Sequence, residues 1–170
     1  MNGLEKWKQE MEEKTSLEIY KNKEKPKQES FYNGSWESSL LFKARTNSLE
    51  INERIKKWGE GPEHCQKCVT GGENIPETIK HIITECPAYT EEREKMEKDI
   101  EGKIGKEKWK KIKREEKMGV DFILGMHTEE NEVINSTKTF LGRMWKERKK
   151  NTNRSGPINH IDHTYTENSA

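Results

Sequence analysis

The chain has 170 residues, 37% of them charged, and only 28 of them are Leu, Ile, Val or Phe. So few core-forming residues exclude a large hydrophobic core and predict that a small folded region needs an additional constraint. The formal net charge of +1 excludes the strong self-repulsion of a highly charged disordered chain.

The N-terminal part is predicted to hold two short helices and a connector. Apolar residues recur at helical spacing within 4–11, and Thr15 with Glu18 matches a capping box that would begin a second helix. Residues 21–30 are polar and form a connector. Residues 1–34 are therefore interpreted as a charged helical lead and linker.

The next elements are a capped helix, a short extended stretch and a further helical turn. Residues 49–51 alternate between apolar and polar, Asn52 can cap the turn that follows, and Gly59 is expected to end it. Ser35 is expected to cap the helix before them, and the apolar face of that helix consists of Trp36, Leu40, Leu41 and Ala44.

All three cysteines belong to one C-x2-C…H-x4-C pattern, formed by Cys65, Cys68, His81 and Cys86. Three thiolates and one imidazole are the ligand set of a closed tetrahedral zinc site. Because a filled shell leaves no position for a reacting water, the pattern predicts one structural Zn²⁺ and no metal catalysis. Structural zinc contributes an apparent ~10–16 kcal/mol to folding, so a zinc-binding hairpin–helix module is predicted for residues 35–100.

A helix break is predicted inside this ligand set. Pro76 is expected at a first-turn position of the helix that carries His81, with Glu77 beside the helix N-terminus. In a continuous helix Cys86 would lie about 500° around the axis from His81 and would point away from it. Pro87 disfavours helical geometry at the preceding residue, so we expect the helix to stop just before Cys86 and the thiolate to turn toward the imidazole.

The cysteine pattern also bears on the compartment. Three cysteines cannot all pair as disulfides, and a metal site of this kind is typical of a reducing compartment, the nucleus or the cytoplasm. The first residues lack an apolar signal segment, and no run approaches the ~18 apolar residues of a membrane span. Secretion and membrane insertion are therefore not expected.

The C-terminal part is predicted to be helical and basic over residues 101–150. Charged helices are expected at 88–102 and 106–118, and Thr128 is expected to cap the last helix. From residue 151 to 170 the chain is polar and is predicted to be disordered. The last helix carries one apolar stripe, formed by Val133, Thr137, Phe140, Leu141, Met144 and Trp145.

Two basic clusters are candidates for phosphate contacts. Residues 101–117 carry eight Lys or Arg against four Glu, and residues 143–154 carry six against one. Such clusters give salt-sensitive, sequence-independent binding to nucleic acid; a solvated helix face and, for the second cluster, a nuclear localisation signal are the alternatives. The candidate contact residues are Lys110, Lys111, Lys113, Arg114, Arg143, Lys146, Arg148, Lys149, Lys150 and Arg154.

The tryptophans and the remaining histidines each have two interpretations. Base stacking is possible for Trp36, Trp58, Trp109 and Trp145. For Trp36 and Trp145 the helical spacing favours a place in the core. His64 adjoins the first ligand and is expected to point away from it. His160 and His163 form a loose pair in the polar tail that is interpreted as coincidence.

Several of these features occur together, and in the same order, in a known family. The chain resembles the C-terminal zinc-binding region of arthropod-type non-long-terminal-repeat (LINE-type) retrotransposon reverse transcriptase polyproteins. The resemblance covers residues 15–150. It is carried by Gly34-Ser35-Trp36, by L-L-F-K-A-R-T at 40–46, by S-L-E-I-N-E-R at 48–54, and by the four ligands followed by Pro87 and Tyr89.

The resemblance implies the same four metal ligands and a role in binding element RNA or target DNA, in a region that follows the polymerase. It does not imply catalysis. Polymerases and endonucleases hold two metal ions with clustered carboxylates, whereas Asp99, Asp121 and Asp162 are isolated in this sequence. We therefore expect a non-catalytic, retrotransposon-derived module that binds nucleic acid mainly through backbone charge and has no small-molecule substrate.

Two alternatives remain open at the level of sequence. The module could be structural or bind another protein, with the apolar stripe of the last helix packed on a reverse transcriptase or another partner. An isolated chain would then expose that stripe. The open reading frame could also be a decayed element fragment with no selected role.

Overall fold

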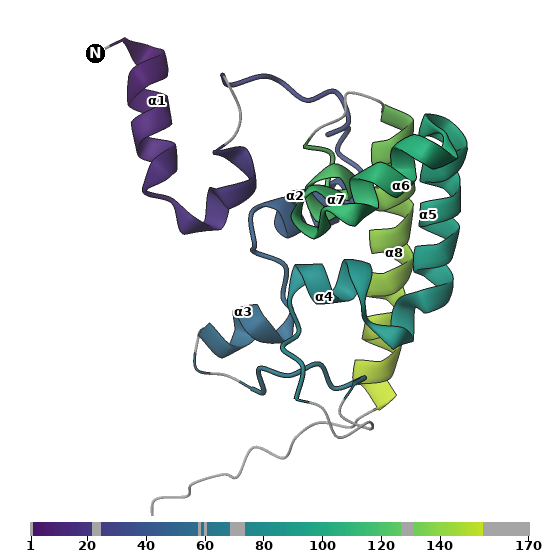
Figure 1. The fold of residues 1–170 in the computed structure, drawn as a ribbon. Helices are drawn as coiled ribbons and strands as arrows, with labels where there is room; N and C mark the ends of the chain where they lie inside the picture. The colour runs from purple at the N-terminus through teal and green to yellow at the C-terminus, as the bar shows by residue number, and fades with distance from the viewer. Residues whose placement is uncertain are drawn as a thin grey trace, which may run out of the picture.

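A computed structural model describes residues 2–21, 25–57, 59, 61–68, 74–126 and 131–154. Within these ranges the chain forms helices and turns, and the only β-pairing is an isolated bridge between His64 and Pro76. The predicted mainly helical fold is confirmed (Figure 1). The helices are α1 (Gly3–Glu12), the 3-10 helix η1 (Thr15–Tyr20), α2 (Trp36–Arg45), α3 (Asn52–Lys57), α4 (Ile79–Thr84), the 3-10 helix η3 (Pro87–Tyr89), α5 (Thr90–Ile104), α6 (Lys106–Arg114), α7 (Glu116–Ile123) and α8 (Asn131–Arg154).

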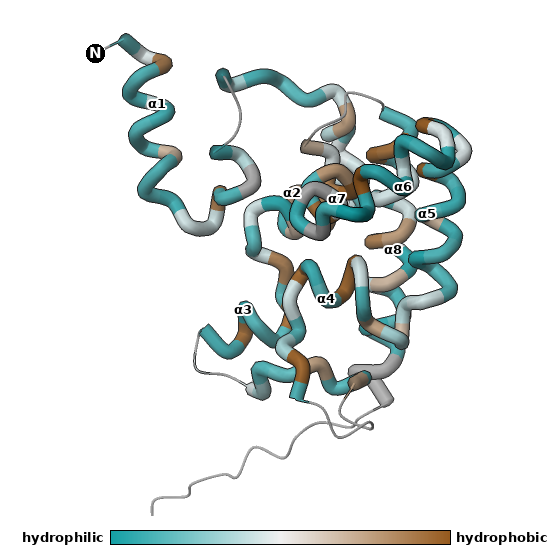
Figure 2. The backbone as a smooth tube through the Cα atoms, viewed as in Figure 1, coloured by the Kyte–Doolittle hydropathy of each residue, from teal (hydrophilic) through white to brown (hydrophobic). Residues whose placement is uncertain are grey.

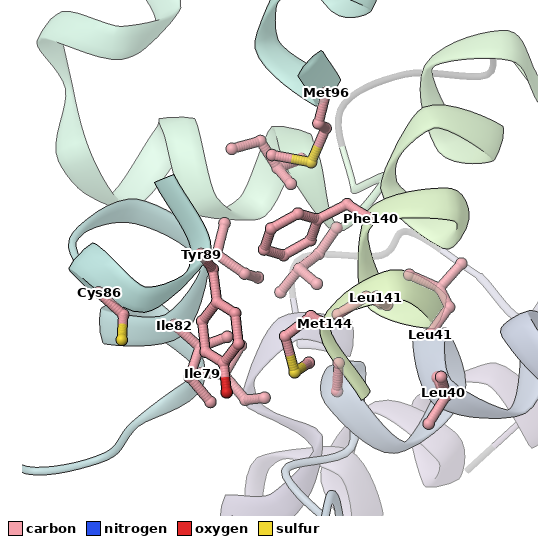
Figure 3. Packing of buried hydrophobic residues seen from close by; sticks show 14 of the residues in the cluster. Leu40, Leu41, Ile79, Ile82, Cys86, Tyr89, Met96, Phe140, Leu141 and Met144 are labelled. Atoms are coloured by element: carbon pink, nitrogen blue, oxygen red, sulfur yellow. The ribbon is translucent and has the colours of Figure 1, made fainter. Parts of the chain in front are cut away.

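Helix α8 is the main packing surface of the fold, with α5 along one side and α2 along another (Figure 1). Its predicted apolar stripe is confirmed, because every residue of the stripe is buried. Figure 3 shows Phe140 and Met144 projecting from α8 toward Tyr89, with Leu41 of α2 on the other side of the helix. The expectation that an isolated chain exposes this stripe is therefore wrong: α2 and α5 of the same chain cover it.

Helix α2 begins where the sequence predicts. The Ser35 hydroxyl accepts a hydrogen bond from the Ser38 amide (3.1 Å), and Leu40, Leu41 and Ala44 are buried. Trp36 differs from the prediction, because 39% of it is exposed. It is the first residue of α2 and lies one turn before Leu40, at the rim of the α2–α8 contact rather than inside it.

Helix α1 stands apart from the packed helices (Figure 1) and is mainly hydrophilic along its length (Figure 2). Its capping box is formed by Asn2 and Glu5. The box expected from Thr15 and Glu18 is wrong, because η1 follows Lys14 without a side-chain cap. The short helix expected there is present in 3-10 form.

Two boundaries in the C-terminal half differ from the prediction. The helix expected at 106–118 is split into α6 and α7, because Glu115 leaves the helical region (φ −100°, ψ 98°). The backbone of α8 continues through Arg154, past the boundary expected at residue 150. The predicted cap at Thr128 and the predicted tail beyond Arg154 lie outside the described residues.

Candidate metal centre

The first two ligands lie in a turn that backbone hydrogen bonds hold on both sides. The Cys65 amide donates to the Ile75 carbonyl (2.8 Å), and the Cys68 amide donates to the Cys65 carbonyl (3.0 Å). The Glu77 amide donates to the Glu63 carbonyl (3.1 Å). These bonds flank the His64–Pro76 bridge, so the segment before α4 runs antiparallel to the ligand turn and holds it in place.

The third ligand is on α4, which begins later than predicted. Thr78 is the N-cap, and its hydroxyl accepts a hydrogen bond from the His81 amide (3.0 Å). Pro76 lies before the helix rather than in its first turn, and Glu77 directly precedes the N-cap, beside the helix N-terminus as expected. The threonine side chain can satisfy a free helical N–H, which proline cannot do. Helix α4 is therefore a short element whose cap bonds directly to the ligand residue.

The predicted break before the fourth ligand is confirmed. The Glu85 and Cys86 amides both donate to the His81 carbonyl (2.9 and 2.8 Å), which ends α4. Cys86 then adopts an extended conformation (φ −56°, ψ 119°) in front of Pro87. The side chain of Cys86 consequently turns back toward His81 instead of continuing around the helix.

The four predicted ligands converge. Their ligand atoms all lie within 4.8 Å of one another, and all four residues are buried. Cys65 Sγ lies 3.7 Å from Cys86 Sγ, and Cys68 Sγ lies 3.3 Å from His81 Nε2. Side chains from two separate segments are thus close enough to bind one metal ion together.

Two of the thiols are held in their neutral form when no cation is present. Burial raises the pKa of the Cys86 thiol to about 12, and burial also raises the pKa of the Cys68 thiol, because the thiolate form of each would be desolvated. A divalent cation bound among the sulfur atoms would reverse this preference by stabilising the thiolates, so binding would release protons.

The imidazole ligand has a carboxylate behind it. His81 Nδ1 lies 3.4 Å from Glu85 Oε2, one helical turn further on. An Nδ1–H donated to this carboxylate leaves the Nε2 lone pair facing Cys68 Sγ and the centre of the ligand group. Such partners orient ligating histidines and raise their basicity.

Glu77 is a buried residue of this region whose role the sequence did not indicate. It is 1% exposed, and Oε2 accepts hydrogen bonds from the Asn52 amide (2.8 Å) and from Arg148 Nη2 (2.9 Å). The side chain of Asn52 in turn donates to the His64 carbonyl (2.6 Å). These bonds connect α3, the ligand turn and α8. An isolated glutamate near a helix start gives no signal of such a partner.

The candidate phosphate contacts on α8 are divided between two environments. The Arg148 guanidinium is mostly buried and bonds to Glu77, and Lys150 pairs with Glu147 (3.5 Å). The exposed side chains Arg143, Lys146 and Lys149 have no ion pair among the described residues. The side chain of Arg154 lies outside them.

Three of the four candidate contacts on α6, Lys110, Lys113 and Arg114, line a groove together with carboxylates of α5. An open groove of about 570 Å³ runs between the two helices, with Glu94, Glu97 and Glu101 on the α5 side. Lys113 pairs with Glu97 and lies over the Trp109 ring, 5.6 Å from its centroid. The other side chains of the set, Lys110, Lys111 and Arg114, are exposed.

The three remaining histidine predictions have different outcomes. His64 does not belong to the converging ligand group, as expected. His160 and His163 lie outside the described residues.

Comparisons with known proteins add no relative. The chain matches no protein-family model, no curated protein and no solved structure. No described helix has both the length and the apolar character needed to cross a membrane.

Proposed function

We propose that the chain is a non-catalytic, retrotransposon-derived zinc module that binds RNA or DNA mainly through backbone charge, in a reducing compartment. The observation that carries the proposal is the convergence of Cys65, Cys68, His81 and Cys86 within 4.8 Å. Thiolate and imidazole donors in a four-ligand set are typical of structural zinc.

The spacing of the ligand atoms is near that of a tetrahedral zinc site. With Zn–S bonds of about 2.3 Å and Zn–N bonds of about 2.0 Å, tetrahedral ligand atoms lie about 3.5–3.8 Å apart. The Cys65–Cys86 sulfur separation of 3.7 Å falls in this range, the Cys68–His81 separation of 3.3 Å is slightly shorter, and no separation among the four exceeds 4.8 Å. Four protein ligands leave no open position on the ion, so the proposed role of zinc is to hold the fold.

Nucleic-acid binding is supported by exposed cations on two helices. Arg143, Lys146 and Lys149 lie along α8 without a paired carboxylate among the described residues, and α6 adds further exposed cations. Exposed lysine and arginine side chains release counterions from a nucleic-acid backbone when they bind it.

The surface that the protein-partner alternative needs is not exposed. It relied on the apolar stripe of the last helix, and that stripe is buried within the chain. No other observation favours a reverse transcriptase partner, so nucleic-acid binding is the function that we propose.

The test has two stages, and the first concerns the metal. The purified chain is analysed for metal content, and its helical circular dichroism is recorded before and after a strong chelator. One equivalent of zinc and a loss of helix on chelation are expected, because structural zinc contributes an apparent ~10–16 kcal/mol. A Cys86→Ser variant is expected to lose the metal, and a helix signal that survives complete metal removal would contradict the structural role.

The second stage measures binding of the zinc-loaded chain to single- and double-stranded oligonucleotides at low and moderate salt. Dissociation constants below ~0.1 mM at low salt, weakening as salt rises, are expected for backbone contacts. Weaker binding to every oligonucleotide would end the proposed nucleic-acid function and leave the metal site unaffected.

A further inference from the structure

Trp36 is an exposed aromatic side chain next to a cation. It is 39% exposed, and the Lys146 ammonium lies over its ring, 5.6 Å from the centroid. A Cβ atom at Gly142 would lie 3.0 Å from Glu37 Cγ, a tight contact, and 3.5 Å from the Trp36 ring, an ordinary contact distance. The Glu37 side chain and the edge of the indole therefore both lie close to the backbone of α8 at Gly142.

An open groove adjoins this region: Ser35 and Glu37, the chain neighbours of Trp36, line it, whereas the Trp36 ring itself lies outside its lining. Its volume is about 320 Å³, within the size range of small-ligand sites. The start of α2 forms one wall, and one face of α8 forms the other. The lining residues are Ser35, Glu37, Asn135, Lys138, Thr139, Gly142, Arg143 and Lys146.

The same face of α8 continues beyond the groove as a row of cations. Helix geometry places residues three and four positions apart on one face. Arg143 and Lys146 line the groove, and Lys149 and Lys150 follow at these spacings. The row therefore leads away from Trp36 along the helix.

The charges of this surface are unbalanced in favour of an anion. Arg143, Lys146 and Lys149 have no ion pair among the described residues. Glu37 is the only carboxylate that lines the groove, and Lys138 inside it is held by the Phe31 carbonyl (2.9 Å). The surface thus combines a partly exposed aromatic ring with cations that have no carboxylate partner among the described residues, one of which, Lys146, lies over that ring.

We propose that the surface made by this groove, the adjoining Trp36 ring and the exposed Lys149 binds single-stranded nucleic acid, with a base stacked on the exposed part of Trp36 and phosphates on Arg143, Lys146 and Lys149. The inference rests on the proposed nucleic-acid function and deepens it. A stacking ring needs an unpaired base, because the bases of a duplex already stack on one another. The ring therefore favours a single strand over a duplex, and over an acidic peptide that has charge but no base.

The test measures anisotropy of labelled single-stranded RNA, single-stranded DNA and a DNA duplex with the zinc-loaded full chain. Trp36→Ala is expected to weaken single-strand binding about 5- to 100-fold, and Trp36→Phe is expected to lose less. The matched control is Phe42→Ala, which removes a 50% exposed aromatic ring on the same helix. The control is expected to bind as the wild type does.

The cation row is tested separately, so that the inference does not depend on one aromatic variant. Arg143→Gln and Lys146→Gln are each expected to lower the slope of log K against log salt by about 0.7 on a single strand. Lys8→Gln on α1, which stands away from α8 (Figure 1), is the charge control and is expected to leave the slope unchanged.

The outcomes separate this inference from the function on which it rests. If no oligonucleotide binds, the proposed function itself fails. If oligonucleotides bind but Trp36→Ala behaves like Phe42→Ala, or the duplex binds better than both single strands, the groove assignment is overturned while the function stands. If polyglutamate competes as strongly as an unlabelled single strand does, the groove assignment is also overturned. If one of the two single strands, RNA or DNA, binds more tightly and Trp36→Ala weakens that binding, the assignment is supported and the preferred strand is identified.

Discussion

Arg148 of α8 forms a bidentate ion pair with Glu77, in the segment that leads into α4, the helix that carries His81. The Glu77 side chain is 2% exposed and the Arg148 side chain 19% exposed, so the pair is largely shielded from water. The pair lies between residues that are 71 positions apart in the chain. It therefore ties the ligand segment to the C-terminal helix, and the two should unfold together.

Removal of the cation from this pair should be strongly destabilising. In Arg148→Met the Glu77 carboxylate stays buried without its partner, and we expect the free energy of unfolding to fall by ~3–5 kcal/mol. Urea denaturation of the zinc-loaded chain measures the loss. Lys149→Met, an exposed neighbour, is the control, with an expected change below about 0.5 kcal/mol. Equal losses in the two variants would show that the pair does not hold the helix.

The carboxylate behind His81 should set metal affinity rather than the fold. Glu85→Gln removes the charge 3.4 Å from His81 Nδ1, and zinc affinity is expected to fall about tenfold, the low end for such partners, because the Glu85 side chain is 47% exposed. Competition with a chelator of known affinity measures the change. Glu91→Gln, at an 82% exposed carboxylate, serves as the control. An unchanged zinc affinity in Glu85→Gln would exclude an orienting role.

The convergence of the four candidate ligands could be predicted from the sequence because its signals are local. The residue types and their spacing identify the candidate ligands. The helix break before Cys86 follows from the steric effect of Pro87 on the preceding residue. The apolar stripe of α8 was equally readable, since one helical period places its residues on a single face. The helix start at Thr78 was missed because Pro76 and Glu77 gave a second, competing start signal.

The features that the sequence did not predict depend on contacts between distant parts of the chain. Glu77, Arg45 and Arg148 look like ordinary surface charges in the sequence, and their burial follows from partners in other elements. The exposure of Trp36 has the same origin. Its helical spacing predicted the core, but the limit of the α2–α8 contact leaves it at the rim, and no pattern within α2 indicates where that contact ends.

Arg45 should contribute as much to the stability of the N-terminal half as Arg148 does to that of the segment around Glu77. Its guanidinium is buried, forms two hydrogen bonds to Glu29 (3.0 and 3.2 Å) and lies over the Tyr20 ring, 4.8 Å from the centroid. A lysine at position 45 cannot form the two parallel hydrogen bonds of the guanidinium to Glu29 or lie flat on the Tyr20 ring as it does. For Arg45→Lys we therefore expect a loss of ~3 kcal/mol in the free energy of unfolding. Lys43→Gln, which breaks an exposed ion pair with Glu50, should lose less than ~1 kcal/mol.

The Arg45→Lys loss is read from urea denaturation with zinc present throughout. Because the metal-binding segment lies elsewhere in the chain, zinc content should stay at the wild-type level. If the free energy of unfolding of Arg45→Lys equals that of the wild type, the segment 25–32 is held mainly by its apolar contacts.

Alkaline pH should destabilise the N-terminal half through a pair of phenols. Burial raises the pKa of Tyr20 and of Tyr32, whose hydroxyls lie 2.9 Å apart. A phenol with a raised pKa in the folded chain contributes stability that is complete below its unfolded pKa of about 10 and is lost as the pH rises above that value. The free energy of unfolding should therefore fall above pH ~10. The near-ultraviolet absorbance of tyrosinate should rise over the same pH range. Tyr20→Phe removes one of these groups and should make the fall shallower, whereas parallel curves for the variant and the wild type would assign the alkaline loss to other groups.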